Sequence, residues 1–593
     1  MASPVTAQTA QPLGTLRFDT SGPPEITSVL SGHLRLLGAQ AADTAPGARP
    51  AGHTVLGGAD FAPAEARTTW ASRGTGIDDE ATVQAATGIM AVHGRRDGEP
   101  RGLAADFTAA ATAVLTVQGL LAALLGQARG CAPAQVTTRA DRAGLLAVSQ
   151  YVAAAGADEG EAAELAPGGP PFVSADGILF ELETLDAGVW AAFWRALQAP
   201  ADAVRAGWRP FQFRYATACA PFPQALHTTA QAHPLHRIRQ AASVSGAEVC
   251  VLRTLAERAA EHDGAAPWAL DVLRPGRMPR TPGPGPVLGR PLAGLTVLEA
   301  GRRIQAPLAA HLLGLLGADV IRIEPPGGDP LRGMPPACSG ISARWLALNR
   351  GKQAVEVDIK AEADRRRLRE MAAEADVFLH NWAPGKAAEL GLDADDFASA
   401  NPALVYACTS GWGGRLADAP MGTDFVVQAR TGVGEAVRPE DEKPAPSLMT
   451  LLDVFGGLLG AEAVLAGLLL RERIGHGVQV DSSLLGAADV LTAPALRRAV
   501  RGDNPRRPAG FRRPLPTADG WVAPGDDCAA AAAAHDLRGL PTDDALRLLH
   551  THGLTATRVT TDLSDLHHDP RFTGSISRDA HGAPVVPDPW SFA

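Results

Sequence analysis

The sequence predicts an α/β protein built on an open parallel sheet, with most of the arrangement present twice. Two observations carry this prediction. From Leu292 onward, short apolar segments alternate with segments of helical periodicity, and four sequence blocks recur in the same order along the 593-residue chain. Strands that alternate with helices form parallel sheets, because a crossover helix returns the chain to the edge where the next strand begins.

The segment Leu292–Arg332 predicts a strand, a turn, a helix and a second strand. Leu295–Leu298 is a short apolar run, Pro307–Leu316 is apolar at helical spacing, and Val320–Ile323 is apolar again, with Glu324 at its end. A strand that passes directly into a helix leaves backbone N–H groups free to bind an anion. The turn has no G-x-G-x-x-G pattern, so it does not indicate a dinucleotide site.

The alternation continues beyond this segment. We expect a turn with a strand, an amphipathic helix and two further strands, over Leu348–Ile359, Ala361–Ala375, Asp376–Leu379 and Asn401–Gly413. Ligands of parallel sheets lie beyond the carboxyl ends of the strands. We expect three polar positions to gather there, namely Gln305, Asn381-Trp382 and Ser410-Gly411.

The duplication consists of four pairs of blocks. The pairs are Glu80–Gly88 with Asp424–Gly432, Ala105–Leu125 with Leu452–Leu470, Phe172–Gly177 with Leu515–Gly520, and Gly246–Leu255 with Gly553–Leu563. The second pair matches if the first copy carries a short insertion. We find no counterpart of Leu292–Glu324 before Glu80, so the first copy is predicted to be truncated at its front.

Four regions follow from these blocks. Residues 1–60 are rich in Ala, Gly, Pro and Thr, and we interpret them as an irregular N-terminal segment. Residues 61–273 form a partial, degenerate lobe, and residues 292–593 form the complete one. Residues 274–291 between them are dense in proline and glycine, which indicates an extended linker.

Composition excludes some classes of function. The chain has 54 basic and 64 acidic residues, and this balance argues against nucleic acid as a partner. Six scattered cysteines indicate reduced thiols and no metal site. The N-terminus shows no export signal, and Gly, Glu or Arg interrupt the longest apolar stretches short of a membrane span. We therefore expect a cytoplasmic protein without a membrane partner.

Several motifs occur together in a recognisable order. They read LAGLTVLEAGRRIQAP, LLGADVIRIEPPGGDPLR, LNRGKQAVEVDIK, DVFLHNWAPG, NPALVYACTSGWG, DFVVQARTG and LLDVFGG, followed by an apolar helix ending in RERIGHG. With these motifs the chain resembles the class III CoA-transferase family of the CaiB/BaiF type. The resemblance covers Leu292 to about Ala593, and the partial first copy from about residue 70 to 270.

The resemblance implies a nucleotide-type large domain with a parallel sheet and a small α+β domain. Family members form homodimers whose chains interlock like links, with the active site between large and small domains. We therefore expect this chain to carry the dimer, or much of it, as a monomeric fused pseudo-dimer, with a homodimer of full chains as the alternative. One complete CoA site would then lie in the second lobe.

The resemblance also implies the chemistry. A family aspartate attacks an acyl-CoA thioester, which gives a mixed anhydride and free CoA thiolate. The incoming carboxylate displaces the first acid, and thiolate attack leads through an aspartyl-CoA thioester to the new product. The matching position is Asp453, and the first copy offers Asp106 at the related place. Backbone N–H groups of Gly456 and Gly457 are candidates to stabilise oxyanions.

The substrates implied are an acyl-CoA and a carboxylic acid, with no permanently bound cofactor. Relatives contact the CoA nucleotide at positions that match Gln305, Ala306, Ile359, Lys360, Asn381 and Trp382. Three cations that the family usually has near CoA phosphates are replaced here by Ala383, Glu389 and Pro420. Other basic residues are candidates to compensate, namely Arg302, Arg303, Arg322, Arg332, Arg350, Lys352 and Lys386.

Two other functions stay open. The first is an acyl-CoA epimerase or racemase, which moves an α-proton with an Asp/His pair. Asp453 matches its aspartate, but the histidine position is Thr423, and no histidine occurs from Asn381 to Gly475. The second is a non-catalytic acyl-CoA binding or scaffold protein, in which Asp453 and Asp106 would only cap helices.

Overall fold

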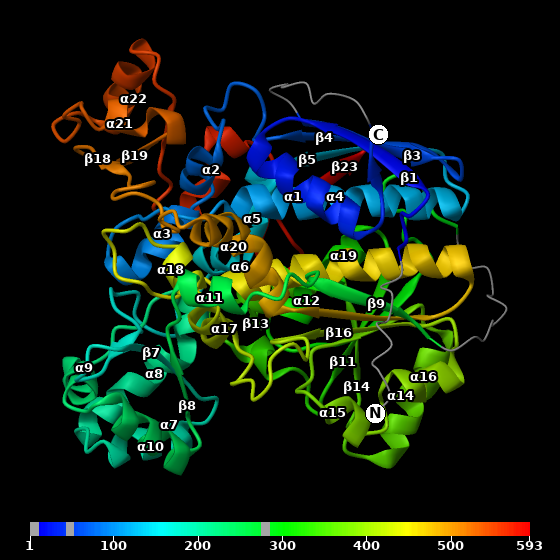
Figure 1. Ribbon diagram of the computed structural model, residues 1–593, viewed down its shortest axis with the longest axis horizontal. Helices are drawn as coiled ribbons and strands as arrows, with labels where there is room; N and C mark the ends of the chain where they lie inside the picture. Colours follow the sequence, from blue (N-terminus) through cyan, green and yellow to red (C-terminus); the bar gives the residue numbers. More distant parts are fainter. Residues whose placement is uncertain (1–10, 43–51, 274–284) are drawn as a thin grey trace.

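The computed structural model describes residues 11–42, 52–273 and 285–593 and consists of two related lobes (Figure 1). Each lobe has a sheet with a long buried helix against it. These two helices, α4 (Phe107–Ala128) and α19 (Leu451–Ile474), lie side by side between the two sheets. The protein is therefore a mixed α/β structure with a duplicated arrangement, as the sequence predicts.

The second lobe contains the predicted parallel sheet. In sheet order its strands are β14 (Gln353–Glu356), β11 (Asp319–Glu324), β10 (Thr296–Ala300), β15 (Val377–His380), β16 (Val405–Ser410), β17 (Val478–Ser483) and β9 (Trp268–Val272). All pairs from β14 to β17 are parallel, whereas β9 runs antiparallel to β17.

Both faces of this sheet are covered. Helices α12 (Gln305–Leu315) and α19 pack on one face, and α14 (Glu362–Glu374) and α16 (Ala394–Ala400) pack on the other. Neighbouring strand residues point to opposite faces, so Val297 joins the core beneath α19, whereas Leu298 joins the core beneath α14. Such a sheet reads as continuous apolar runs, which is why its strands are visible in the sequence.

The first lobe has a smaller sheet of mixed strand direction. In sheet order the strands are β2 (Gln40–Ala41), β1 (Leu16–Ser21), β3 (Gly52–Gly58), β4 (Phe61–Thr69), β5 (Gln135–Arg139) and β23 (Trp590–Phe592). Strand β3 is antiparallel to both β1 and β4, because a tight hairpin joins β3 to β4 where the second lobe uses crossover helices.

The interpretation of residues 1–60 as irregular, and of the first copy as truncated at its front, is wrong. Strand β1, helix α1 (Pro24–Leu36) and strand β2 form the counterpart of β10, α12 and β11, and α1 packs on α4 as α12 packs on α19. The helix is half polar, so its apolar pattern is weaker than that of buried α12. The predicted linker, residues 274–291, lies largely outside the described residues.

The two copies exchange their last strands. Strand β9 ends the first copy and pairs with β17 of the second lobe, where Trp268 lies opposite Ser482. Strand β23 ends the second copy and pairs with β5 of the first lobe, where Trp590 lies opposite Thr138. Each sheet is thus completed by the other copy.

The small domains are exchanged in the same way. The first copy forms β6 (Phe172–Val173), β7 (Leu179–Glu183) and β8 (Glu248–Val251) with helices α7 (Ala187–Ala196), α8 (Ala201–Thr217), α9 (Gln224–Gln231) and α10 (Leu235–Ser245). The second copy forms β18 (Leu515–Pro516), β19 (Trp521–Pro524) and β20 (Ala556–Arg558) with α22 (Thr542–Thr551). Strands β7 and β8 pack on α17 (Asp424–Arg430) of the second lobe, and β19 and β20 pack on α2 (Glu80–Ala86) of the first.

Helices α4 and α19 form the centre of the core. The rings of Phe107 and Phe455 have centroids 5.9 Å apart, and Gln118 Nε2 donates to the Leu458 carbonyl at 2.6 Å. Contrary to the sequence expectation, both helices are long and apolar enough to cross a membrane, but both are buried inside the protein. A buried hydrogen bond between His33 Nδ1 and Glu462 Oε1, 2.9 Å long, also joins the lobes.

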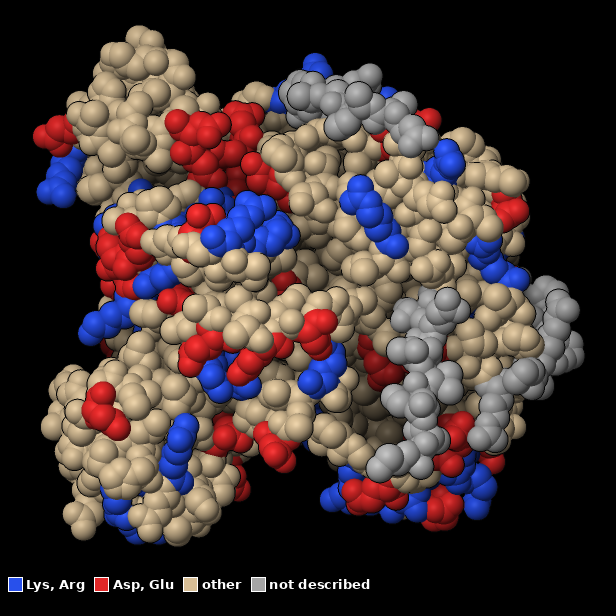
Figure 2. Space-filling view, viewed as in Figure 1, with Lys and Arg blue, Asp and Glu red and all other residues tan. Residues whose placement is uncertain are grey.

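The surface carries charges of both signs. Acidic and basic side chains are interspersed over the described part of the face in Figure 2, which has no continuous basic stripe of the kind that binds nucleic-acid phosphates.

Candidate active site

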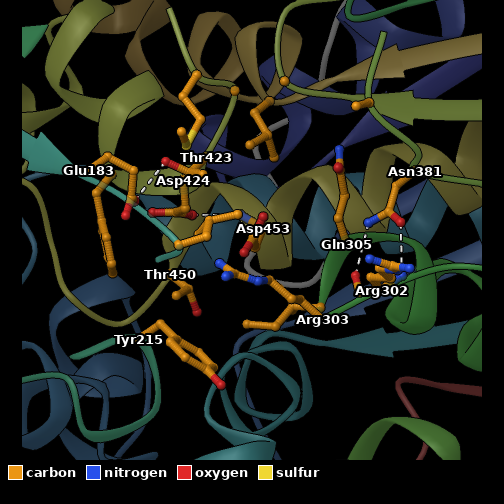
Figure 3. A pocket seen from close by; sticks show the side chains of 18 of the residues that line it. Glu183, Tyr215, Arg302, Arg303, Gln305, Asn381, Thr423, Asp424, Thr450 and Asp453 are labelled. Atoms are coloured by element: carbon orange, nitrogen blue, oxygen red, sulfur yellow. Dashed lines mark hydrogen bonds between the residues drawn. The ribbon is translucent and has the colours of Figure 1, made fainter. Parts of the chain in front are cut away.

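A cavity of about 670 Å³ opens at the carboxyl ends of the second-lobe strands (Figure 3). Second-lobe residues line one side, including Gln305, Asn381, Trp382, Ser410, Gly411 and Asp453. The small domain of the first copy lines the other side with Glu183, Thr184, Leu185, Trp208, Gln212, Arg214 and Tyr215. The gathering of Gln305, Asn381-Trp382 and Ser410-Gly411 is confirmed.

Asp453 lies in the first turn of α19 and lines the cavity. It is not the cap of that helix, because the N-cap is Thr450, which has a left-handed φ of 54°. The Asp453 carboxylate accepts no hydrogen bond from the described residues. Burial raises its pKa to about 6, and the nearby Arg303 guanidinium acts in the opposite direction. A half-buried carboxylate without partners is available to react.

Asp424 holds the first turn of α19 in place. Its Oδ2 accepts the backbone N–H of Asp453 at 2.7 Å, and its Oδ1 accepts a hydrogen bond from Gln428. Gln428 is fixed in turn by two hydrogen bonds with the backbone of Ser447. Burial, together with the charge of Asp453, raises the pKa of Asp424. This carboxyl faces a helix N-terminus, which suits an acidic group, and it positions the backbone of Asp453.

Glu183 brings a further carboxylate to the cavity from β7 of the first copy. Its Oε2 accepts the Thr423 hydroxyl at 2.9 Å, and its Oε1 accepts Arg214 Nη2 at 2.9 Å. Thr423 occupies the position of the racemase histidine, and its side chain is committed to Glu183. The contribution of the first copy is not predicted from the sequence, because repeat pairing does not reveal an exchange of small domains.

The turn before α12 places two arginines at the cavity. Asn381 Oδ1 accepts the backbone N–H of Arg302 at 2.8 Å, and Asn381 Nδ2 donates to the Arg302 carbonyl at 2.9 Å. Arg303 has a left-handed φ of 61°, and its guanidinium points toward the Asp453 carboxylate (Figure 3). The same guanidinium lies 5.5 Å from the ring centroid of Tyr215.

The predicted oxyanion role of Gly456 and Gly457 is wrong. Both glycines lie inside α19 and pack against α12 without lining the cavity. A Cβ at Gly456 would lie 2.8 Å from Gln305 Nε2, and one at Gly457 would lie 2.9 Å from the Gln305 carbonyl. They are glycines because the two helices approach closely. Gln305 Nε2 is itself buried without a hydrogen-bond partner in the described structure.

The other residues predicted to contact CoA lie outside the lining of this cavity. Ala306 is fully buried in α12, Ile359 packs on the core beneath α14, and Lys360 is exposed at the surface. Their contact with a CoA nucleotide stays a prediction. Asn381 and Trp382 remain candidates, since both line the cavity.

Most of the candidate compensating cations are already engaged. Arg322 and Lys352 pair with Glu299, Arg332 pairs with Glu324, and Lys386 pairs with Glu389. Arg350 donates to the Ala347 carbonyl. The side chains of Arg302 and Arg303 make no hydrogen bond or ion pair within the described chain, and both line the cavity.

The first lobe has a similar helix start without the reactive carboxylate. Glu80 takes the place of Asp424 and accepts the backbone N–H groups of Thr108 and Ala109. The sequence spacing between Glu80 and Ala109 equals that between Asp424 and Asp453, so Ala109 occupies the nucleophile position and no insertion is needed.

Asp106 is therefore not the counterpart of Asp453. It is the N-cap residue of α4, which corresponds to Thr450, and its carboxylate pairs with Arg512 and Arg507. Burial alone would raise the pKa of Asp106, but these two arginines lower it below the ordinary value.

A family model described as CoA-transferase family III matches residues 67–282 and 292–570. The chain belongs to CoA-transferase family III. Relatives in this family include "Succinyl-CoA:glutarate CoA-transferase" of Mus musculus, which is 36% identical over 204 residues, covering 33% of this chain and 46% of that protein. "Acetyl-CoA:oxalate CoA-transferase" of Acetobacter aceti is 35% identical over 229 residues, covering 38% and 58% respectively.

The "Probable fatty acyl-CoA transferase Rv3272" of Mycobacterium tuberculosis is 36% identical over 211 residues, covering 35% of this chain and 54% of that protein. The chain thus spans about half the length of these curated family III relatives. A crystal structure of a CAIB/BAIF family protein from Brucella suis is 27% identical, with a TM-score of 0.45, covering 50% of this chain and 91% of that one.

Proposed function

We propose that this protein transfers CoA from an acyl-CoA thioester to a carboxylic acid, with Asp453 as the nucleophile. The observation that carries the proposal is the Asp453 carboxylate, which lines the cavity without any hydrogen-bond partner from the described chain. Membership of CoA-transferase family III supports the reaction class. Named relatives that act on glutarate and oxalate support a carboxylate as the acceptor.

The chemistry proceeds through exchange at the aspartyl carboxyl group. An Asp453 oxygen attacks the thioester carbonyl, the C–S bond breaks, and CoA leaves as the thiolate with a mixed anhydride behind it. The thiolate attacks the aspartyl carbonyl of the anhydride and releases the first carboxylate. The acceptor carboxylate then attacks the aspartyl thioester, and the thiolate finally attacks the new acyl carbonyl, which regenerates Asp453.

Two features of the site serve these steps. Asp424 and Gln428 fix the first turn of α19, so the backbone that carries the nucleophile is held in place. Gln305 Nε2 is a buried N–H donor without a partner beside that turn, and we assign it to the carbonyl oxygen that gains charge during attack.

We also propose that one chain corresponds to the interlocked dimer of its relatives. The mutual exchange of β9 and β23, and of the two small domains, supports a fused pseudo-dimer. The chain would then be a monomer with one active site. Light scattering on purified protein should give the mass of a single chain, whereas an obligate dimer of full chains would contradict this part.

The experiment that tests the proposed reaction is a trapping assay. Incubation with an acyl-CoA and hydroxylamine should release CoA and leave a hydroxamate at Asp453, found by peptide mass spectrometry. Asp453→Asn should prevent both events. Asp106→Asn is the matched control, because this residue is paired with arginines in the first lobe. Full turnover by Asp453→Asn would refute the proposal.

Epimerisation is the second candidate, favoured by one observation. Glu183 lines the same cavity as Asp453, so two carboxylates flank one space. Burial has the largest effect on the pKa of Asp453 and Arg303 the next largest, and the charge of Glu183 raises this pKa further. Such a pair could remove and return an α-proton. Incubation in deuterium oxide distinguishes the candidates, because epimerisation exchanges the α-hydrogen of the acyl group and transfer does not.

A further inference from the structure

The cavity contains a cation that the protein itself leaves unpaired. Arg214, also in the lining, is bound to Glu183, whereas Arg303 forms no ion pair or hydrogen bond with the described chain. The Arg303 guanidinium points toward Asp453 and stacks near the ring of Tyr215, whose hydroxyl is turned to Met334. An arginine held in this way presents its donors to a ligand.

The position of Arg303 excludes the phosphates of CoA as its partner. Asp453 must meet the thioester carbon, so the CoA sulfur lies at the Asp453 end of the cavity. The pantetheine arm separates that sulfur from the phosphates by a long chain of bonds. A guanidinium beside Asp453 therefore meets the acyl group, and Arg302, on the Asn381 side of the turn, is the better candidate for the nucleotide end.

The charge balance of the cavity indicates what Arg303 binds. Arg214 neutralises Glu183 and burial raises the pKa of Asp424, so Arg302 and Arg303 outweigh the charge of Asp453 and the cavity attracts an anion. The reacting carboxyl group loses its charge in the anhydride and thioester states, so it cannot remain the partner of a permanent cation. A second carboxylate on the same acid keeps its charge throughout the reaction and stays paired with Arg303.

Resting on the proposed function, we infer that the acid transferred is a short dicarboxylic acid whose non-reacting carboxylate binds Arg303. Guanidinium and carboxylate form charge-assisted hydrogen bonds with matched geometry. The acid must be short, because Arg303 lies beside the nucleophile. Asp453 and Gln305 engage the reacting end of the acid, and Arg303, which lies against the ring of Tyr215, engages the free end.

Two CoA esters with the same carbon chain test this assignment. Succinyl-CoA ends in a carboxylate and butyryl-CoA ends in a methyl group. Because hydroxylamine leaves a hydroxamate at Asp453, each active site releases CoA once; the dependence of that single-turnover rate on ester concentration gives the second-order rate constant of the first half-reaction, which stands for kcat/KM. We expect the full chain to prefer succinyl-CoA in kcat/KM. Arg303→Met should lower kcat/KM for succinyl-CoA by about 10- to 100-fold. The loss for butyryl-CoA should be much smaller, so the preference disappears.

Two variants serve as controls. Arg303→Lys keeps the charge and should retain part of the preference for succinyl-CoA. Arg302→Met removes the neighbouring charge and should leave unchanged the ratio of kcat/KM for succinyl-CoA to kcat/KM for butyryl-CoA. Thermal unfolding of each variant shows whether the fold is intact.

The outcomes separate the inference from the proposed function. Equal losses for both esters in Arg303→Met, or no preference in the unmodified protein, would overturn the assignment of Arg303. CoA release from Asp453→Asn at the normal rate would instead refute the nucleophile, whatever the behaviour of Arg303. A preference that survives Arg303→Met would place the recognition of the free carboxylate on another residue and would also overturn the inference.

Discussion

The two lobes begin their central helices in the same way and differ in one decisive position. In both, a buried carboxyl group accepts backbone N–H groups from the first turn, Glu80 at α4 and Asp424 at α19. The second lobe adds the unpaired carboxylate of Asp453, whereas the first has Ala109 there. The carboxyl group that anchors the helix start, Glu80 or Asp424, is therefore structural and occurs in both lobes. The unpaired carboxylate at the Asp453 position occurs in the second lobe alone.

The sheets differ in a way that agrees with this division. The second-lobe sheet is covered on both faces, and its crevice opens at the strand ends where the strand order reverses, between β10 and β15. The first-lobe sheet is covered by α1 and α4 on one face, and its other face carries exposed Arg17, Asp19 and Arg67. The first lobe contributes its small domain to the active site of the second.

The largest effect should come from the position that distinguishes the lobes. Asp453→Asn removes the nucleophile, so we expect kcat to fall by about 10³-fold or more. Asp106→Asn in the first lobe should keep kcat and lower the stability through loss of its arginine pairs. Steady-state CoA transfer and urea unfolding measure the two effects. Comparable losses of activity in both variants would mean that the lobes share the chemistry.

The two anchoring acids should separate activity from stability. Asp424→Ala frees the first turn beside the nucleophile, and we expect kcat to fall by about 10- to 100-fold. Glu80→Ala leaves the buried backbone donors of Thr108 and Ala109 unsatisfied, so it should cost about 1–3 kcal/mol of unfolding free energy. Folded Glu80→Ala should stay active. An inactive but fully folded Glu80→Ala protein would show that the first lobe acts in the reaction.

The pH dependence should report on Asp453. The nucleophile must be ionised, and burial raises its pKa to about 6, so activity should fall about tenfold per pH unit below that value. Removing the charge of Arg303, which lowers this pKa, should move the acid limb to higher pH. Asp106→Asn should leave the limb in place. Rate profiles between pH 4 and 8 check these shifts, and an acid limb unaffected by Arg303→Met would contradict them.

The smallest effect should come from Lys360, which is exposed and outside the cavity lining. We expect Lys360→Ala to change KM for the acyl-CoA by no more than about threefold, because a solvated charge contributes little. Arg302→Ala is the matched cavity variant and should raise KM more. Initial rates at several acyl-CoA concentrations measure both. An equal or larger effect at Lys360 would extend the binding surface along β14.

Most of the second lobe could be predicted because its strands are buried on both faces and read as apolar runs. The front of the first lobe could not, since β1 and α1 each have an exposed polar side. A signal was nevertheless present. His33–Ala39 reads HLRLLGA and His311–Ala318 reads HLLGLLGA, and the two match with one residue deleted.

The sequence predicts only the side of the cavity that the second lobe forms. Asp453, Gln305 and Asn381 follow strands or begin helices of one sheet, so topology brings them together. Glu183 and Tyr215 reach the cavity from the other copy, through contacts that no local pattern encodes. Asp106 matches Asp453 in residue type only, and equal spacing from the anchoring acid identifies Ala109 as the true counterpart.

The mutual exchange of β9 and β23 has a mechanical consequence. Each sheet includes an edge strand from the other copy, so separation of the copies requires the backbone hydrogen bonds of both edge strands to break. We therefore expect that cleavage of the backbone between β9 and β10 leaves two fragments that remain associated as one complex. We expect two separately made polypeptides, each containing one fragment, to assemble into the same structure when both are present while the sheets form.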